Sequence, residues 1–139
     1  MLTRALFALV LVCGRAAAAA AEETKVLALG LTDHVPAQDE FEGGADLASP
    51  KFNSPGVAYA LVANAKRGDT VEVALTKDGT SLMHNTRELE ADEDKVLLLA
   101  GKTGVPAGGW PDGLYTASVT VTRDGKPVIE QRSDPVPFQ

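Results

Sequence analysis

The chain has 139 residues, of which 45% are hydrophobic and 23% are charged. This length suits one compact domain, and the composition is neither that of a membrane bundle nor that of a disordered tail. The formal net charge of -6 argues against a nucleic-acid partner, because binding a polyanion relies on a basic patch that releases counterions. The single cysteine cannot form an internal disulfide bond.

Residues 1–21 have the order of a secretory signal peptide. A short positive head precedes an apolar run, and a tail of small residues offers several Ala-x-Ala cleavage frames. The apolar run is too short to cross a membrane, and Arg15 interrupts it. We expect cleavage near Ala19 to Ala21 and a periplasmic or secreted protein. Cys13 leaves with this segment, so thiol chemistry is excluded from the mature chain.

Residues 22–51 are expected to form a strand followed by an acidic linker. Residues 25–31 are short and apolar, as a strand requires. Residues 32–51 are polar and contain breakers such as Pro36 and Pro50, so a loop is expected there. At about 20 residues this loop is longer than most ordered loops, which suggests either mobility or a functional role.

Residues 52–139 are expected to form a sheet-rich domain. Residues 70–77 and 114–122 alternate between apolar and polar side chains, and an Asp-Gly pair follows each of them. This combination predicts two hairpins with tight turns. Further strands are expected at residues 52–63, 80–84, 96–100 and 126–131, with a weaker one at 87–91. Pro135 and Pro137 are expected to stop further pairing at the C-terminus.

Two stretches of the chain carry a resemblance to a known class of domain. Residues 52–55 (Phe-Asn-Ser-Pro) lead into an apolar strand, and residues 110–115 (Trp-Pro-Asp-Gly-Leu-Tyr) open the last hairpin. The pattern resembles the small immunoglobulin-like, or fibronectin-III-like, sandwich domains of bacterial exported proteins. The resemblance implies an all-β sandwich of about seven strands. It also implies a binding or accessory module without a shared set of catalytic residues.

The second stretch is interpreted as a structural turn. Trp110 and Pro111 set the chain direction, and Gly113 permits a backbone angle that a side chain disfavours. Tyr115 then begins the buried face and resembles the corner tyrosine whose hydroxyl ties a loop back to a sandwich. We favour packing over ligand binding for these aromatic residues, because aromatic side chains commonly anchor cores.

Metal binding is the second hypothesis. Met83 and His84 offer a soft, copper-type ligand pair, with His34 as a third ligand. Adjacent residues of a strand point to opposite faces, so Met83 and His84 share a metal only if the strand bends. The simpler interpretation is that Met83 packs inward and His84 is solvated. No bound cofactor is expected.

Catalysis is the third and least favoured hypothesis. No serine lies in a Gly-x-Ser-x-Gly elbow, and the chain has only two histidines. No catalytic residue is therefore assigned, and a small hydrolase with an unrecognised site is kept only as an alternative.

The sequence most favours an exported, non-catalytic module that engages another envelope protein. Such a module would use an exposed face, an edge strand or its acidic N-terminal segment. We predict that the partner meets residues 22–51, because this segment is long, acidic and without an expected packing role. The alternative is that the segment is a plain tether.

Overall fold

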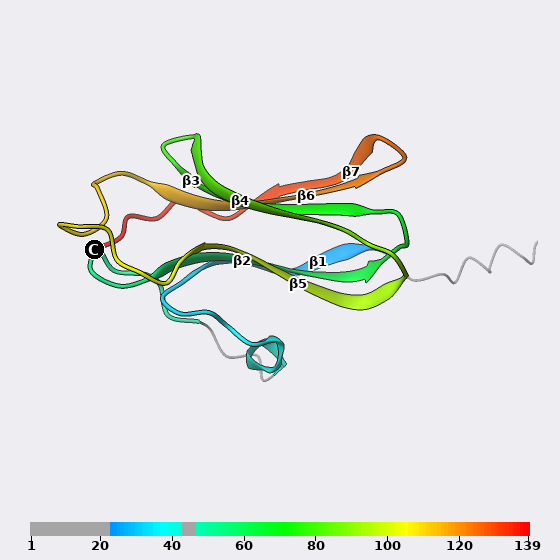
Figure 1. Cartoon of the computed structure of the whole chain (residues 1–139), viewed down its shortest axis with the longest axis horizontal. Helices are drawn as coiled ribbons and strands as arrows, with labels where there is room; N and C mark the ends of the chain where they lie inside the picture. The colour runs from blue at the N-terminus through cyan, green and yellow to red at the C-terminus, as the bar shows by residue number, and fades with distance from the viewer. Residues whose placement is uncertain (1–22, 43–46) are drawn as a thin grey trace, which may run out of the picture.

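A computed structural model of the chain describes residues 23–42 and 47–139 (Figure 1). The expected signal peptide at residues 1–21, with Cys13 and the cleavage frames, lies outside the described residues. Within the described ranges, no helix has the length and apolarity that crossing a membrane requires. The strands are β1 (Lys25–Thr32), β2 (Gly56–Ala65), β3 (Thr70–Lys77), β4 (Thr80–Glu88), β5 (Glu93–Lys102), β6 (Tyr115–Arg123) and β7 (Lys126–Arg132), and η2 (Gln38–Phe41) is a 3-10 helix.

The strands form two antiparallel sheets that pack face to face (Figure 1). One sheet has three strands in the order β1-β2-β5, and the other has four in the order β4-β3-β6-β7. The expectation of an all-β sandwich is therefore confirmed. The core between the sheets is built from the inward side chains of both. Its largest fully buried members include Val62, Val71, Val73, Leu75, Val96, Val119 and Val121.

Both Asp-Gly pairs form the tight turns that the sequence predicts. Asp78 and Gly79 have φ angles of 50° and 87°, and Asp124 and Gly125 have φ angles of 54° and 78°. Positive φ at both central residues gives the turn twist that matches a right-handed hairpin. The β3 strand has the bounds expected from its alternation.

β4 and β5 are longer than their apolar residues suggested. β4 continues to Glu88, opposite Thr70, and β5 begins at Glu93, opposite Ala65. Two residues of the acidic run at residues 92–94, Glu93 and Asp94, thus belong to β5. Backbone pairing does not need apolar side chains when one face of a strand meets solvent.

The C-terminal segment is wrongly predicted to stop pairing. Val136 lies between Pro135 and Pro137, and its N–H donates to the Tyr115 carbonyl at 2.9 Å, while the Tyr115 N–H donates to the Val136 carbonyl at 2.7 Å. The prolines remove their own donors but leave that of Val136 intact. Phe138 then turns inward and stacks on Tyr115, with ring centroids 3.9 Å apart.

A polar network joins several strands at the opposite end of the sandwich. The carboxylate of Asp69 is buried and accepts two hydrogen bonds of 2.8 Å from the Arg123 guanidinium and one of 2.9 Å from the Lys66 N–H. Arg123 also donates to the Thr24 hydroxyl at 2.9 Å. The hydrogen bonds from Arg123 are the main cause that lowers the pKa of Asp69. At this end of the sandwich, the charge-assisted hydrogen bonds between Asp69 and Arg123 therefore hold the strands together.

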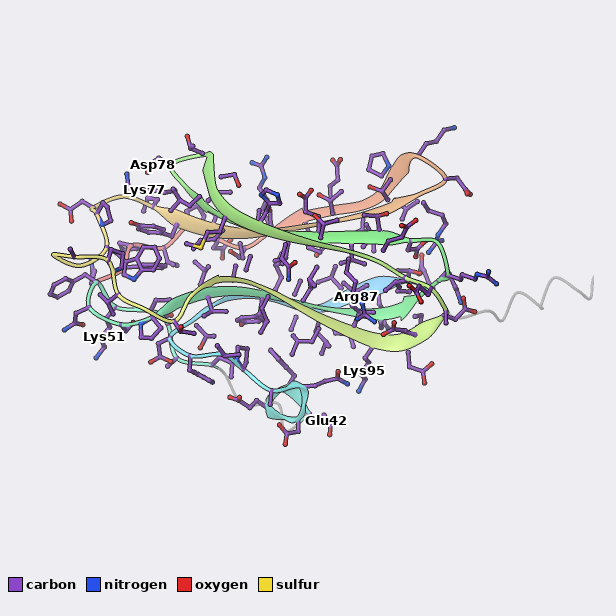
Figure 2. All side chains as sticks on the ribbon, viewed as in Figure 1. Glu42, Lys51, Lys77, Asp78, Arg87 and Lys95 are labelled. Carbon is purple, nitrogen blue, oxygen red and sulfur yellow. The ribbon has the colours of Figure 1, made fainter. Side chains whose placement is uncertain are left out.

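The open edges of the sheets are interrupted or covered. β1, β4 and β7 each carry a bulge, and the extra residue is an exposed apolar side chain: Leu27, Leu82 or Val128. On β5, the Leu99 carbonyl accepts a hydrogen bond of 3.0 Å from Asn85 of β4. Arg87 of β4, labelled in Figure 2, also pairs with Glu93 of β5. Bulges and coverage of this kind protect edges from pairing with other chains.

The chain before Phe52 packs on the sandwich more extensively than the sequence indicated. β1 pairs with β2 along its length and contributes the buried Leu31 to the core. The expectation that the following loop has no packing role is wrong. Residues 33–42 and 47–51, here called the strap, lie against the outer face of the three-stranded sheet (Figure 1). Residues 43–46 lie outside the described chain.

Candidate functional site

The outer face of the three-stranded sheet is apolar, unlike an ordinary solvated sheet face. Outward residues of β2 and β5 stand opposite one another, with Tyr59 beside Leu99 and Leu61 beside Leu97. Leu61 is only 4% exposed, although it points away from the core between the sheets. Strands that are apolar on both faces need cover on both faces. The strap supplies the outer cover.

Two contacts fasten the strap to this face. The Thr32 hydroxyl is fully buried at the end of β1 and donates to the Ala48 carbonyl at 2.8 Å. The Phe41 ring, from η2, lies over the Tyr59 ring with centroids 5.1 Å apart. A Cβ atom at Gly30 would lie 2.6 Å from the Tyr59 hydroxyl oxygen, so Gly30 provides the space that Tyr59 occupies across β1.

The cover is incomplete and leaves an open cavity of ≈ 590 Å³. Its walls come from four places, namely the strap, the strands β1 and β2, the start of β5, and the chain after β7. The apolar walls are Leu27, Ala28, Leu31, Phe41, Leu47, Tyr59, Leu61 and Val136, and the polar ones include Gln38, Glu42, Ser49, Lys95, Ser133 and Asp134. Figure 2 shows Glu42 on the strap and Lys95 on β5 on this same side of the molecule. The volume lies within the range of ligand-binding cavities.

The bulge of β1 opens one side of this cavity. Leu27 is the extra residue between the pairs formed by Val26 and Ala28, and it is 45% exposed. Among the described residues β1 is an edge strand, so this leucine lies at the rim of the three-stranded sheet. The site thus combines an apolar wall with an accessible edge.

His34 holds the first half of the strap by bridging two carboxylates. Its Nδ1 lies 2.9 Å from an oxygen of Asp33, and its Nε2 lies 2.7 Å from an oxygen of Glu40. The other oxygen of Glu40 accepts the Ala37 N–H at 2.8 Å. Hydrogen bonds to Asp33 and then to Glu40 raise the pKa of His34. The Ala37 N–H, followed by His34, lowers the pKa of Glu40. We call this pair of contacts the His34 bridge.

The three candidate metal ligands do not come together. His34 follows β1, at one edge of the sandwich, while Met83 and His84 lie on β4, at the other edge. On β4, Met83 packs against the core and His84 is exposed, as alternation requires. Within residues 23–42 and 47–139, no three His, Cys, Asp or Glu side chains are arranged to hold a metal ion.

The turn at residues 110–115 is a packing element. The indole N–H of Trp110 donates to the Ser54 carbonyl at 2.8 Å. The hydroxyl of the fully buried Tyr115 donates to the Pro111 carbonyl at 2.6 Å, and burial raises the pKa of this hydroxyl. Gly113 has a φ of 153°, and a Cβ atom there would lie within 2.8 Å of Lys77 and Asp78. These groups are turned inward rather than toward a ligand.

The cavity walls do not bring a histidine to a serine or a carboxylate. Ser133 and Asp134 line the cavity, but neither His34 nor His84 does. The Ser133 hydroxyl oxygen is already engaged, because it accepts the Ala117 N–H at 2.9 Å.

Comparison of the chain with protein-family models, with curated proteins and with solved structures gives no significant match. Sequence reasoning did not identify the cavity. The signal it left unused is the continuous apolar run within each of β2 and β5, at residues 57–63 and 96–100, which predicts cover on both faces of the sheet.

Proposed function

We propose that the protein is an exported, non-catalytic binding module of immunoglobulin-like fold that engages another envelope protein. The strand order supports this fold class, since such sandwiches place the first, second and fifth strands in one sheet and the third, sixth and seventh in the other. The fourth strand differs from the constant-type arrangement, because β4 lies beside β3. The Tyr115 hydroxyl also supports it, because it binds the backbone a few residues upstream at the start of the sixth strand. The N-terminal pattern of residues 1–21 supports export.

The observation that carries the proposal is the partly covered apolar face of the three-stranded sheet. A fully packed strap would seal the face, and a solvated face would carry polar side chains. This face instead has a cavity of ≈ 590 Å³ beside an exposed leucine. Exposed apolar surface with a polar rim is characteristic of interaction sites. A partner would insert an apolar side chain beneath the strap, where aromatic and aliphatic walls meet.

Point substitutions are preferable to deletion of residues 22–47 as a test of this face. Such a deletion removes β1, which pairs with β2 and places Leu31 in the core. Loss of binding by that variant would then report loss of the sheet rather than loss of a contact.

Leu27 and Leu82 form a matched pair for the test. Each is the extra residue in the bulge of an edge strand, and their exposed fractions are 45% and 44%. Leu27 lines the cavity, whereas Leu82 belongs to β4 of the other sheet. The same Leu→Glu change at both positions separates the effect of the cavity from that of added charge.

The partner is first identified by photo-crosslinking in intact cells. A photoreactive residue replaces Leu99 on the apolar face, and another replaces Thr120 on the four-stranded sheet as a control. We expect a discrete adduct from position 99 alone. With the purified partner, Leu27→Glu is expected to weaken binding by about tenfold, and Leu82→Glu by less than about twofold. Equal losses from both variants, or an adduct only at position 120, would refute the proposed face.

A further inference from the structure

We propose that the strap is a pH-dependent cover for the binding face, closed while the His34 bridge is intact and loosened when the imidazole loses its proton. The biological meaning of this inference rests on the proposed function, because a cover regulates only a face that binds something. The inference itself concerns residues 33–42 and the cavity that they overlie.

The geometry of the bridge requires a protonated imidazole. Both ring nitrogens of His34 lie within hydrogen-bond distance of a carboxylate oxygen, at 2.9 Å for Asp33 and 2.7 Å for Glu40. A neutral imidazole has one N–H donor, and its other nitrogen carries a lone pair. Only the imidazolium donates to both carboxylates. Loss of the proton therefore removes one hydrogen bond and sets a lone pair against a negative oxygen.

Glu40 connects the bridge to the cover. One of its carboxylate oxygens meets His34, and the other accepts the Ala37 N–H at the start of η2. The Glu40 N–H donates to the Ala37 carbonyl at 3.0 Å, which closes the turn. This short helix supplies Gln38 and Phe41 to the cavity walls. Release of Glu40 thus frees the element that carries Phe41 over Tyr59.

Few buried side chains fix η2 in place. None of its own residues is buried, although Pro36, two residues before it, is buried, and the Phe41 ring contacts the Tyr59 ring. A short element without a buried side chain of its own belongs to the low end of the local stability range. A modest change at His34 is therefore sufficient to alter how often the segment opens.

The charges around the imidazole all favour its protonated form. Asp33 faces it from the end of β1 and Glu40 faces it from η2, while the Thr32 hydroxyl lies 3.4 Å from Nδ1. The other charged residues described in the strap, Asp39, Glu42 and Lys51, form no ion pair with His34. No cation therefore competes for the two carboxylates among the described residues.

The sign of the pH dependence follows from both partners. The pKa of His34 is raised above 6.5, so its contribution is full below that pH and is lost as the pH rises through the raised pKa. The pKa of Glu40 is lowered below 4.5, so its contribution is present above that pH and is lost as the pH falls through the lowered pKa. The cover is most firmly closed at mildly acidic pH and opens toward alkaline pH.

Amide hydrogen exchange tests the cover without a partner. The Glu40 and Glu42 N–H groups donate to carbonyls of the η2 turn, and the Val136 N–H in the described sheet serves as reference. After correction for intrinsic exchange, we expect protection at Glu40 and Glu42 to fall about threefold or more between about pH 5.5 and about pH 8.5. Protection at Val136 is expected to stay constant.

The two histidines provide a matched control. His34→Gln is expected to give low protection at both pH values, while His84→Gln is expected to retain the wild-type response. Glu40→Gln is expected to behave as His34→Gln does. A flat profile in the wild type, or a profile unchanged by His34→Gln, overturns the inference.

A second measurement separates this inference from the proposed function. The affinity of N-phenyl-1-naphthylamine, an uncharged apolar dye, is measured at both pH values for the wild type and both His→Gln variants. Tighter binding at the higher pH, abolished by His34→Gln alone, supports the cover. A pH response without any partner adduct at position 99 refutes the proposed function and leaves the cover intact. A partner adduct at position 99 together with flat exchange profiles supports the proposed function and refutes the cover.

Discussion

The outer faces of the two sheets differ in side-chain chemistry and in cover. On the four-stranded sheet, the outward residues of β3 and β6 pair as Thr70 with Thr122 and as Thr76 with Thr116. On the three-stranded sheet, the corresponding outward pair is Leu61 with Leu97, and the strap lies over it. Polar side chains remain hydrated without cover, whereas apolar side chains gain free energy when removed from water.

The difference shows how a strand pattern indicates what lies outside a sheet. Strict alternation, as in β3 and β6, indicates one buried and one solvated face. A continuous apolar run, as in β2 and β5, indicates that both faces are covered. Where the cover is incomplete, as at the cavity, the exposed remainder is a candidate for binding.

The largest difference in stability between the two sheets is expected when a charge is placed on the outer face of each. Leu61→Lys inserts an ammonium beneath the strap and is expected to lower the free energy of unfolding by about 3 kcal/mol. Thr120→Lys, on the four-stranded sheet, is expected to change it by no more than about 0.5 kcal/mol. Urea unfolding of both variants measures the difference. Equal losses would mean that the strap does not exclude water from Leu61.

A smaller effect is expected from removing one hydroxyl on each sheet. Thr32→Val leaves the Ala48 carbonyl without its buried donor and is expected to cost about 1–2 kcal/mol. Thr76→Val removes a longer, half-buried contact of 3.4 Å with the Thr116 carbonyl and is expected to cost less than about 0.5 kcal/mol. Thermal unfolding of the pair ranks the two contacts. A larger loss from Thr76→Val would reverse the comparison between the sheets.

The smallest effect on stability is expected at the two bulge leucines. Leu27→Glu and Leu82→Glu alter exposed side chains, so each is expected to change the free energy of unfolding by less than about 0.5 kcal/mol. Their expected effects on partner binding are nevertheless different, as described above. Urea unfolding checks that the binding result is not a consequence of unfolding. A large loss of stability at Leu27 alone would remove that interpretation.

Much of the sandwich could be predicted from local pattern. The alternation of β3 and β6 and the two Asp-Gly turns identify four strands, because side-chain period and turn angles are local properties. The site was harder to predict. Phe41 and Tyr59 are far apart in the sequence, and nothing local indicates that their rings meet. His34 was considered as a metal ligand, although its ring nitrogens contact Asp33 and Glu40.

The sequence by itself determined most of the strands and both hairpin turns, and its continuous apolar runs carry the information that one sheet needs cover on both faces. These follow from alternation, from glycine at positive φ and from continuous apolar runs, all of which act between neighbours in the chain. Only the tertiary structure decided what provides the cover. The strap reaches the outer face because Thr32 meets Ala48 and Phe41 meets Tyr59, and such contacts depend on how the chain returns through space. The cavity is the part of that face which the returning chain leaves unfilled.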